Sequence, residues 1–193
     1  TVTKEADFGQ RANDIDSSLR DVWQVAAKDG KTAVSDTRPY QPSAGAPAQF
    51  VAAPIREDNE IIGVVAIQLS LDAVNSIMTE RSGMGETGET YLIGSDLLMR
   101  SDSFLDPTNH TVAASFADPE KGNVDTEAAK VALAGNAGAD VIIDYNGNPV
   151  LSAYAPITMG NTTWAILAEI DVAEAFCPKI EGKEKDFFTQ YNE

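Results

Sequence analysis

The spacing of apolar and polar positions along the chain predicts a mixed fold of strands and helices. Residues 61–71 and 141–145 are apolar runs rich in β-branched residues, which is typical of strands. Two stretches with helical spacing, 17–30 and 125–135, begin with serine, threonine or acidic residues and end at a glycine. The pattern therefore predicts an α+β fold in which antiparallel sheets are flanked by helices.

Turn-forming residues set the expected limits of several other elements. A glycine-rich lead-in precedes a predicted strand at Thr90–Ile93, a turn at residues 94–96 and a second strand at Leu97–Arg100. Gln49–Pro54 is predicted to be a strand that the proline ends. Residues 104–122 are predicted to form a long loop because Pro107 and Pro119 interrupt them.

Three further elements are expected: a strand at the start of the chain, a helix after the apolar run 61–71, and a helix near the end of the chain. Thr1–Thr3 alternates like the end of a strand. Asp72 is predicted to cap a helix that runs to about Arg81. Residues 185–191 have the spacing of an amphipathic helix.

The second half of the chain repeats the first at a constant spacing. Pro54 and Pro156 lie 102 residues apart, and Gly45 and Gly147 share this spacing. Each half also places a helix that ends in glycine upstream of these positions. Two copies are too few for a solenoid, so the repeat predicts two tandem modules.

We expect the modules at residues 1–80 and 84–176, followed by a helical tail or linker at 177–193. The first copy has no counterpart of Thr90–Ile93, so it is predicted to be incomplete at its N-terminus. An uncovered strand edge of that kind favours pairing with another chain.

Composition excludes several functional classes. The formal net charge is −16, which repels nucleic acid and anionic lipid surfaces, so neither is expected as a partner. His110 is the sole histidine and is predicted to lie at the surface of a loop, and Cys177 is the sole cysteine. These two residues cannot build a thiol triad or a zinc cluster, and we expect no catalysis, no metal and no cofactor.

Three segments, read in order, resemble a known family of sensor domains. They are SDTRPYQPSAGAPAQFVAAPI from Ser35, GVVAIQLSLDAV from Gly63 and GETGETYLIGSDLLMRSDS from Gly85. Together they resemble the double Cache domain, a tandem of PAS-like modules, over roughly residues 1–176. The resemblance implies an extracytoplasmic sensing domain of the kind found in bacterial chemoreceptors, histidine kinases and cyclases.

The same resemblance supplies candidate binding residues in the first module. Related domains that bind amino acids carry an arginine and aromatic residues in the helix, and Arg20 and Trp23 match this pattern; Asp36 and Tyr40 follow downstream. An arginine can hold a carboxylate through two parallel hydrogen bonds. The aspartate that holds the ligand ammonium in these relatives is replaced by Gln68. A second acid two residues after the tyrosine is replaced by proline.

In the second module, five polar residues fall on predicted strands or strand ends: Tyr91, Arg100, Asp102, Tyr145 and Tyr154. The candidate binding residues among them are Tyr91, Arg100 and Asp102. Strand alternation places Arg100 and Asp102 on one face. Arg100 therefore either binds a carboxylate or pairs with Asp102. The alternative for Arg20 and Trp23 is likewise structural, with the tryptophan in the core and the arginine in solvent.

These observations predict a small-molecule sensing domain of a transmembrane signalling receptor in chemotaxis or related signal transduction. Its ligand is expected to carry a carboxylate and no free amine. We expect a periplasmic or cell-surface location, contact with the membrane only through flanking segments, and a homodimer or self-assembly through helices. The alternative is a structural or assembly protein whose Cache-like modules are completed by a neighbouring subunit.

Overall fold

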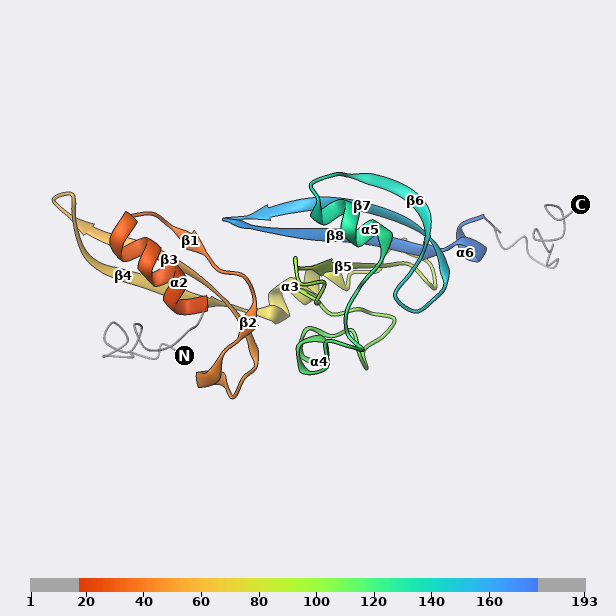
Figure 1. The fold of residues 1–193 in the computed structure, drawn as a ribbon, viewed down its shortest axis with the longest axis horizontal. Helices are drawn as coiled ribbons and strands as arrows, with labels where there is room; N and C mark the ends of the chain where they lie inside the picture. Colours follow the sequence, from red (N-terminus) through yellow and green to blue (C-terminus); the bar gives the residue numbers. More distant parts are fainter. Residues whose placement is uncertain (1–17, 177–193) are drawn as a thin grey trace, which may run out of the picture. The chain divides into compact units, whose positions relative to one another are not determined.

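A computed structural model of the chain describes residues 18–176 and shows a mixed fold with two antiparallel sheets (Figure 1). The chain divides into two compact units. Unit 1 extends to Val74 and includes Thr158–Thr162, and unit 2 comprises Asn75–Ile157 and the residues from Thr163 onward. The predicted α+β fold with antiparallel sheets is confirmed.

Unit 1 is built around strand β3, which pairs with three other strands. The helix α2 becomes the π-helical turn η1, which ends at Gly30 in the left-handed conformation. On one side β3 pairs with β4, and on the other with β1 and then β2. Its elements are α2 Ser18–Gln24, η1 Val25–Asp29, β1 Ala33–Val34, β2 Arg38–Pro39, η2 Gln41–Ser43, β3 Pro47–Glu57 and β4 Glu60–Leu69.

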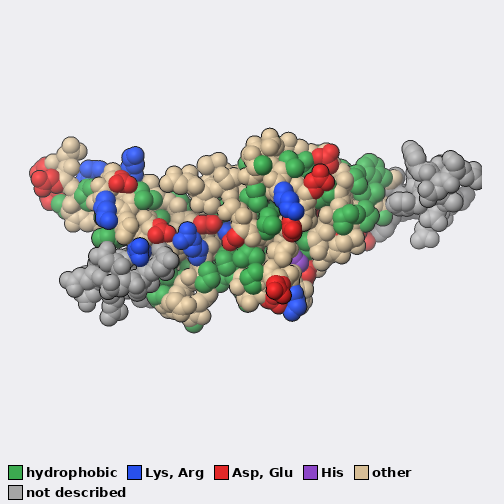
Figure 2. Space-filling model, in the orientation of Figure 1, with side chains coloured by type: hydrophobic (Ala, Val, Ile, Leu, Met, Phe, Trp, Pro, Cys, Tyr) green, Lys and Arg blue, Asp and Glu red, His purple; other side chains and the backbone are tan. Residues whose placement is uncertain are grey.

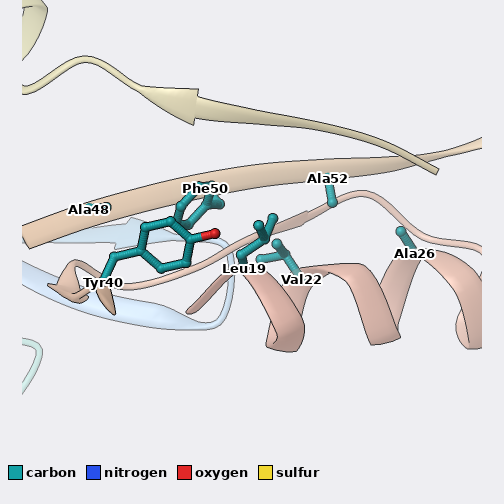
Figure 3. Packing of buried hydrophobic residues seen from close by; sticks show 7 residues of the cluster. All are labelled: Leu19, Val22, Ala26, Tyr40, Ala48, Phe50 and Ala52. Carbon is teal, nitrogen blue, oxygen red and sulfur yellow. The ribbon is translucent and has the colours of Figure 1, made fainter. Parts of the chain in front are cut away.

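The core of unit 1 is a single layer of side chains between α2 and β3 (Figure 3). Tyr40 and Phe50 meet edge to face, with their ring centroids 4.9 Å apart. Ala33 and Val64 pack against the margin of this cluster. The buried members are Leu19, Val22, Ala26, Tyr40, Ala48, Phe50 and Ala52. Three of the seven are alanines, so this core is thin.

The sequence predicted that Pro54 ends its strand, and this prediction was wrong. Pro54 pairs with Val64 inside β3, which continues to Glu57. A proline is tolerated there because β1, the neighbour on the other side, pairs only with Val51 and Ala52. At Pro54 the strand is therefore an edge on that side, where no ladder hydrogen bond is lost.

Unit 2 carries the sheet order β5-β8-β7-β6. The helix α5 begins at the N-cap Thr126, whose hydroxyl accepts from the backbone N–H of Ala129. The helix α3, Leu71–Met78, spans the division between the units. The other elements are β5 Glu89–Ile93, α4 Val112–Ala117, α5 Glu127–Leu133, β6 Gly138–Ile143, β7 Pro149–Met159, β8 Thr162–Asp171 and α6 Val172–Phe176.

Three expected elements were wrong in detail. Asp72 lies inside the first turn of α3 and is not its cap, and the helix ends at Met78. Leu97–Arg100 forms isolated bridges and no strand. The predicted loop 104–122 contains α4, which Thr111 caps by accepting from Ala114 N–H. The expected strand at residues 1–3 and helix at 185–191 lie outside the described residues.

The two long hairpins have the same bounds at the predicted spacing. The strands β3 and β7 differ by 102 residues at both ends, and so do β4 and β8. The second strands nevertheless bury different positions. Leu167 and Glu169 are buried in β8, whereas their counterparts Val65 and Ile67 are 47% and 60% exposed in β4.

A β-bulge accounts for the exposed positions of β4. Ile55 pairs with Gly63 while Arg56 pairs with Ile61, so Ile62 is an extra residue in the ladder. A shift of one residue turns every following side chain to the other face of a sheet. The bulge therefore directs the apolar side chains of Val65 and Ile67 away from the core.

Candidate ligand-binding site

Unit 2 contains a buried polar network centred on Glu89. This glutamate is 3% exposed and occupies the first position of β5. Its Oε2 accepts from the Ser103 hydroxyl at 2.7 Å and from the backbone N–H groups of Phe104 and Leu105. Its Oε1 accepts from the hydroxyl of Tyr145. One carboxylate thus holds the start of the 104–122 segment against the sheet.

A second buried glutamate lies directly across the ladder. Glu169 of β8 pairs with Glu89 of β5, and its Oε2 accepts from the Tyr91 hydroxyl at 2.8 Å. Burial raises the pKa of the Glu169 carboxyl, and the hydrogen bond from Tyr91 partly opposes that rise. Burial also raises the pKa of the Tyr91 hydroxyl. Tyr91 therefore remains a neutral donor whose hydroxyl is used inside the protein.

His110 belongs to this network and is not at the surface, which corrects the prediction from the sequence. It is 3% exposed and its ring lies 4.1 Å from that of Tyr145. Its Nδ1 lies 2.8 Å from Asp106 Oδ2. The Asp106 pKa is lowered: burial alone would raise it, but hydrogen bonds from His110, Asn109 and Thr108 outweigh that effect.

Arg100 is buried and makes its contacts within unit 2. It is 1% exposed, and its guanidinium bonds Asp96 at 3.0 Å and the carbonyl of Leu98 at 3.0 Å. It also lies over the rings of Phe116 and Trp164. The sequence analysis offered an ion pair between Arg100 and Asp102 as one alternative; Arg100 does form an ion pair, but with Asp96.

Asp102 is engaged elsewhere. Its Oδ1 accepts from Val112 N–H at 2.7 Å, at the start of α4, and its Oδ2 accepts from Asn75 Nδ2 at 2.7 Å. Tyr91, Arg100 and Asp102, the three candidates of the second module, therefore each bond different partners inside unit 2. Their polar groups hold the fold together.

A cleft of about 500 Å³ lies where α5 begins and β6 ends. Tyr145 is the residue of the buried network that lines it. Its other lining residues are Asn123, Asp125, Thr126, Glu127, Ile142, Ile143 and Asp144. Tyr145 is also one of the strand residues that the sequence singled out in the second module, whereas Tyr91, Arg100 and Asp102 are not among the lining residues. The cleft carries three carboxylates, which would repel an anionic ligand.

In unit 1, Arg20 and Trp23 are both half-buried on α2. Leu19 and Val22, which alternate with them, face the sheet. Asp21 bonds Arg38 of β2 at 3.1 Å on the surface. Arg20 and Trp23 are three residues apart, so they share one flank of the helix.

The other candidates of the first module differ in their surroundings. Tyr40 is part of the core and Asp36 Oδ1 accepts from Thr37 N–H at 2.7 Å. Gln68 is exposed on β4 and pairs with Phe50, so both side chains lie on the sheet face that α2 covers. Thr37 was not predicted. Its hydroxyl is buried without a hydrogen-bond partner among the described residues.

The buried network of unit 2 is the part that sequence reasoning missed. Glu89 and Glu169 lie near the ends of apolar strands, where a polar residue ordinarily marks the solvent side, and Ser103 lies in the irregular segment that follows residues 97–100. One signal could have found them. Glu89 shares its strand face with Tyr91 and Ile93, both apolar in character, and a charge on such a face must be paired when it is buried.

Figure 2 shows acidic and basic side chains interspersed over one face of the molecule. The net charge of −16 therefore does not fix the sign of the charge around any one site. Among residues 18–176, no cluster of three or more potential ligands is arranged to hold a metal ion. In the same part of the chain, no helix combines the length and the hydropathy that crossing a membrane requires.

Comparison with known proteins identifies relatives of this fold. A family model described as "Cache domain" matches residues 4–178. A search of curated protein sequences found no match.

Three solved structures are similar over most of this chain. The periplasmic sensory domain of the Campylobacter jejuni chemoreceptor Tlp1 has a TM-score of 0.55 and 20% identity, covering 85% of this chain and 57% of that one. The ligand-binding domain of Pseudomonas aeruginosa PctB, in complex with L-Arg, has a TM-score of 0.51 and 21% identity, covering 85% of this chain and 64% of that one. The ligand-binding domain of Pseudomonas fluorescens CtaA, in complex with L-leucine, has a TM-score of 0.51 and 16% identity, covering 84% of this chain and 63% of that one. The chain spans less than two thirds of each relative.

Proposed function

From the premise that this chain belongs to the Cache domain family, we propose that it is a ligand-binding sensor domain of a transmembrane signalling receptor. It acts outside the cytoplasmic membrane and has no catalytic role of its own. Its two units are tandem modules. Ligand binding shifts a conformational equilibrium that flanking segments carry to the membrane.

The proposed ligand site lies in unit 1, on the flank of α2 that faces β4. Asp21 contacts β2, which lies on the opposite side of β3 from β4. Successive helix residues turn by about 100°, so Arg20 and Trp23 project on the flank away from Asp21. That flank faces Gln68, which lies on the covered face of the sheet. The observation that carries the proposal is the strand register, which sets Gln68 opposite Phe50 on the face that α2 covers; from it we infer that a cation, an aromatic ring and an amide lie on the same side of α2.

The proposed ligand is a small carboxylate without a free amine. The Arg20 guanidinium would bind the carboxylate through paired hydrogen bonds, and the Trp23 ring would cover its apolar part. An ammonium group has no carboxylate to meet it at Gln68 or Pro42, the positions that hold acids in amino-acid sensors of this family. The CtaA and PctB domains are complexed with amino acids, so the proposal separates this chain from them.

Calorimetry tests the proposal. The chain is titrated with acetate, propionate, pyruvate and succinate, and with L-leucine and L-arginine. We expect at least one amine-free acid to bind, and Arg20→Ala to weaken that binding by about 2–4 kcal/mol because a buried carboxylate loses its partner. Arg38→Ala is the matched control, because it removes an exposed arginine of β2 that bonds Asp21 on the other flank of α2.

Two results would contradict the proposed site. One is tight binding of an ordinary amino acid. The other is an acid whose affinity is unchanged in Arg20→Ala, which would show that its binding site does not include Arg20.

A further inference from the structure

The helix α6 contacts unit 2 through a charged side chain and fully buries none of its own. No residue of α6 is buried, and Phe176 is 55% exposed. A helix of five residues is too short to be stable by itself in water, so contacts outside the helix must hold it. Glu174, in the middle of α6, bonds residues 86 and 87, which precede it by 88 and 87 positions.

The carboxylate of Glu174 fits a cradle made by residues 85–87. Its Oε1 accepts from the backbone N–H of Glu86 at 2.8 Å. Its Oε2 accepts from the backbone N–H of Thr87 at 2.8 Å and from the Thr87 hydroxyl at 2.6 Å. Successive backbone N–H groups that converge on one point form a concave site for an anion. Both carboxylate oxygens are thus bound by one short loop.

Gly85 leaves the space that the carboxylate fills. Its φ is +69°, and a Cβ atom at this position would overlap Oε1 of Glu174. Gly83 has a similar φ of +81°, but a Cβ atom there would meet nothing within 4 Å. The two glycines therefore share a left-handed backbone conformation, and the carboxylate requires a glycine at position 85 for a second, steric reason.

Arg81 orients the same loop from its other side. Its Nη2 donates to the carbonyl of Gly85 at 2.8 Å and to that of Glu86 at 2.7 Å. In a trans peptide the C=O and the following N–H point in opposite directions. The two carbonyls that face Arg81 therefore turn the N–H groups of residues 86 and 87 toward Glu174. The guanidinium charge on one side of these peptides favours an anion on the other.

We propose that residues 85–87 form a carboxylate-binding cradle, and that Glu174 is a latch that occupies it and holds α6 on unit 2. The cradle lies between α3 and β5, and α6 follows β8 directly, so the latch couples α6 to the segment that follows α3. When α6 leaves, the cradle can take another small carboxylate. When α6 is docked, the tethered carboxylate excludes a free one because its effective concentration is high.

NMR of the ¹⁵N-labelled chain tests the latch. Glu174→Ala should move the amide protons of Glu86 and Thr87 upfield, because each loses a hydrogen bond to a charged oxygen. It should also lower the heteronuclear NOE of residues 172–176, which reports fast backbone motion, because the helix is released. Glu80→Ala is the matched control. It removes another glutamate that accepts from a backbone N–H and a hydroxyl in the same connecting segment, and should leave α6 docked.

Acetate tests the cradle in the same spectra. In Glu174→Ala, we expect acetate to return the amide protons of Glu86 and Thr87 toward their parent positions in a saturable way, while residues 172–176 stay flexible. Sodium chloride at the same ionic strength should not do so. In the parent chain these two amides should not respond, because the tethered carboxylate already occupies the cradle.

The two glycines supply a matched pair of variants. Added to Glu174→Ala, Gly83→Ala should keep the acetate response, because its methyl group enters open space. Gly85→Ala should abolish the response, because its methyl group fills the space of a bound oxygen. Thr87→Val removes the hydroxyl donor and should weaken acetate binding about tenfold, the effect of one hydrogen bond to a charged group.

Two kinds of result would overturn the proposal. Unchanged amide protons at residues 86 and 87, or an unchanged α6, in Glu174→Ala would show that this carboxylate does not hold the helix. An acetate response that is absent, that chloride reproduces or that survives Gly85→Ala would show that the loop is not a carboxylate cradle. Amide signals elsewhere in the chain show that each variant is folded, and Thr87→Val decides if Gly85→Ala is not. None of these results bears on ligand binding at Arg20, which calorimetry tests separately.

Discussion

The two units of this protein contain hairpins whose bounds match at a spacing of 102 residues, but they use their polar side chains in opposite ways. In unit 2, Tyr91, Arg100 and Glu169 are buried and bonded to one another or to the backbone of their own unit. In unit 1, Arg20 and Trp23 are half-buried on a helix that covers a core rich in alanine. The buried polar residues of unit 2 therefore stabilise that unit, whereas Arg20 and Trp23 of unit 1 lie near its surface.

The largest effect expected from this comparison is at the two arginines. We expect Arg100→Ala to lower the free energy of unfolding by about 3 kcal/mol, because it strips the Leu98 carbonyl of a donor and leaves a cavity beside Trp164. Arg20→Ala should cost about 1 kcal/mol or less. Urea unfolding followed by circular dichroism, which reports the secondary structure of both units, measures both. Equal costs at the two positions would break the comparison.

The next effect is the pH dependence of unit 2. The pKa of Glu169 is raised in the folded protein, so the folded state binds more protons than the unfolded state between the ordinary value near 4.5 and the raised value. Stability should therefore fall as pH rises through that window, by up to about 1.4 kcal/mol for each unit of pKa difference.

Glu169→Gln should remove this slope and keep a hydrogen-bond acceptor for Tyr91. Urea unfolding at a series of pH values measures the slope, and Glu60→Gln, in the turn-side end of β4, is the control expected to retain it. If Glu169→Gln and the parent chain show the same slope, the buried carboxylate is not its source.

The sequence was a good guide to the strands and a poor guide to their partners. Alternation and turn residues located the strands of the first hairpin, and the spacing of 102 residues relates their ends to those of the second hairpin. Pro54 misled because its effect depends on whether a neighbouring strand lies beside it, and that depends on where β1 stops. The helix α4 was missed because its single capping threonine, Thr111, lies among proline and polar residues typical of a loop.

The candidate site was predictable only in part. A resemblance to a known family directed attention to Arg20, Trp23 and Gln68, and the register of β3 and β4 places Gln68 on the face that α2 covers. The burial of Arg100 could not be predicted, because one arginine in a strand pattern suits a ligand and an internal ion pair equally well. The extra residue Ile62, which turns the apolar face of β4 outward, leaves no mark in the hydrophobic pattern.

The central claim is that unit 1 binds the ligand, and the two tryptophans allow a direct test because each unit contains one. The chain is labelled with 5-fluorotryptophan, and ¹⁹F NMR is recorded during titration with each acid of the calorimetric panel; Trp23→Phe assigns the two resonances. We predict that the Trp23 resonance shifts in a saturable way while that of Trp164, which is 1% exposed, stays in place. A saturable shift of Trp164 with no change at Trp23 would contradict the account and place the site in unit 2.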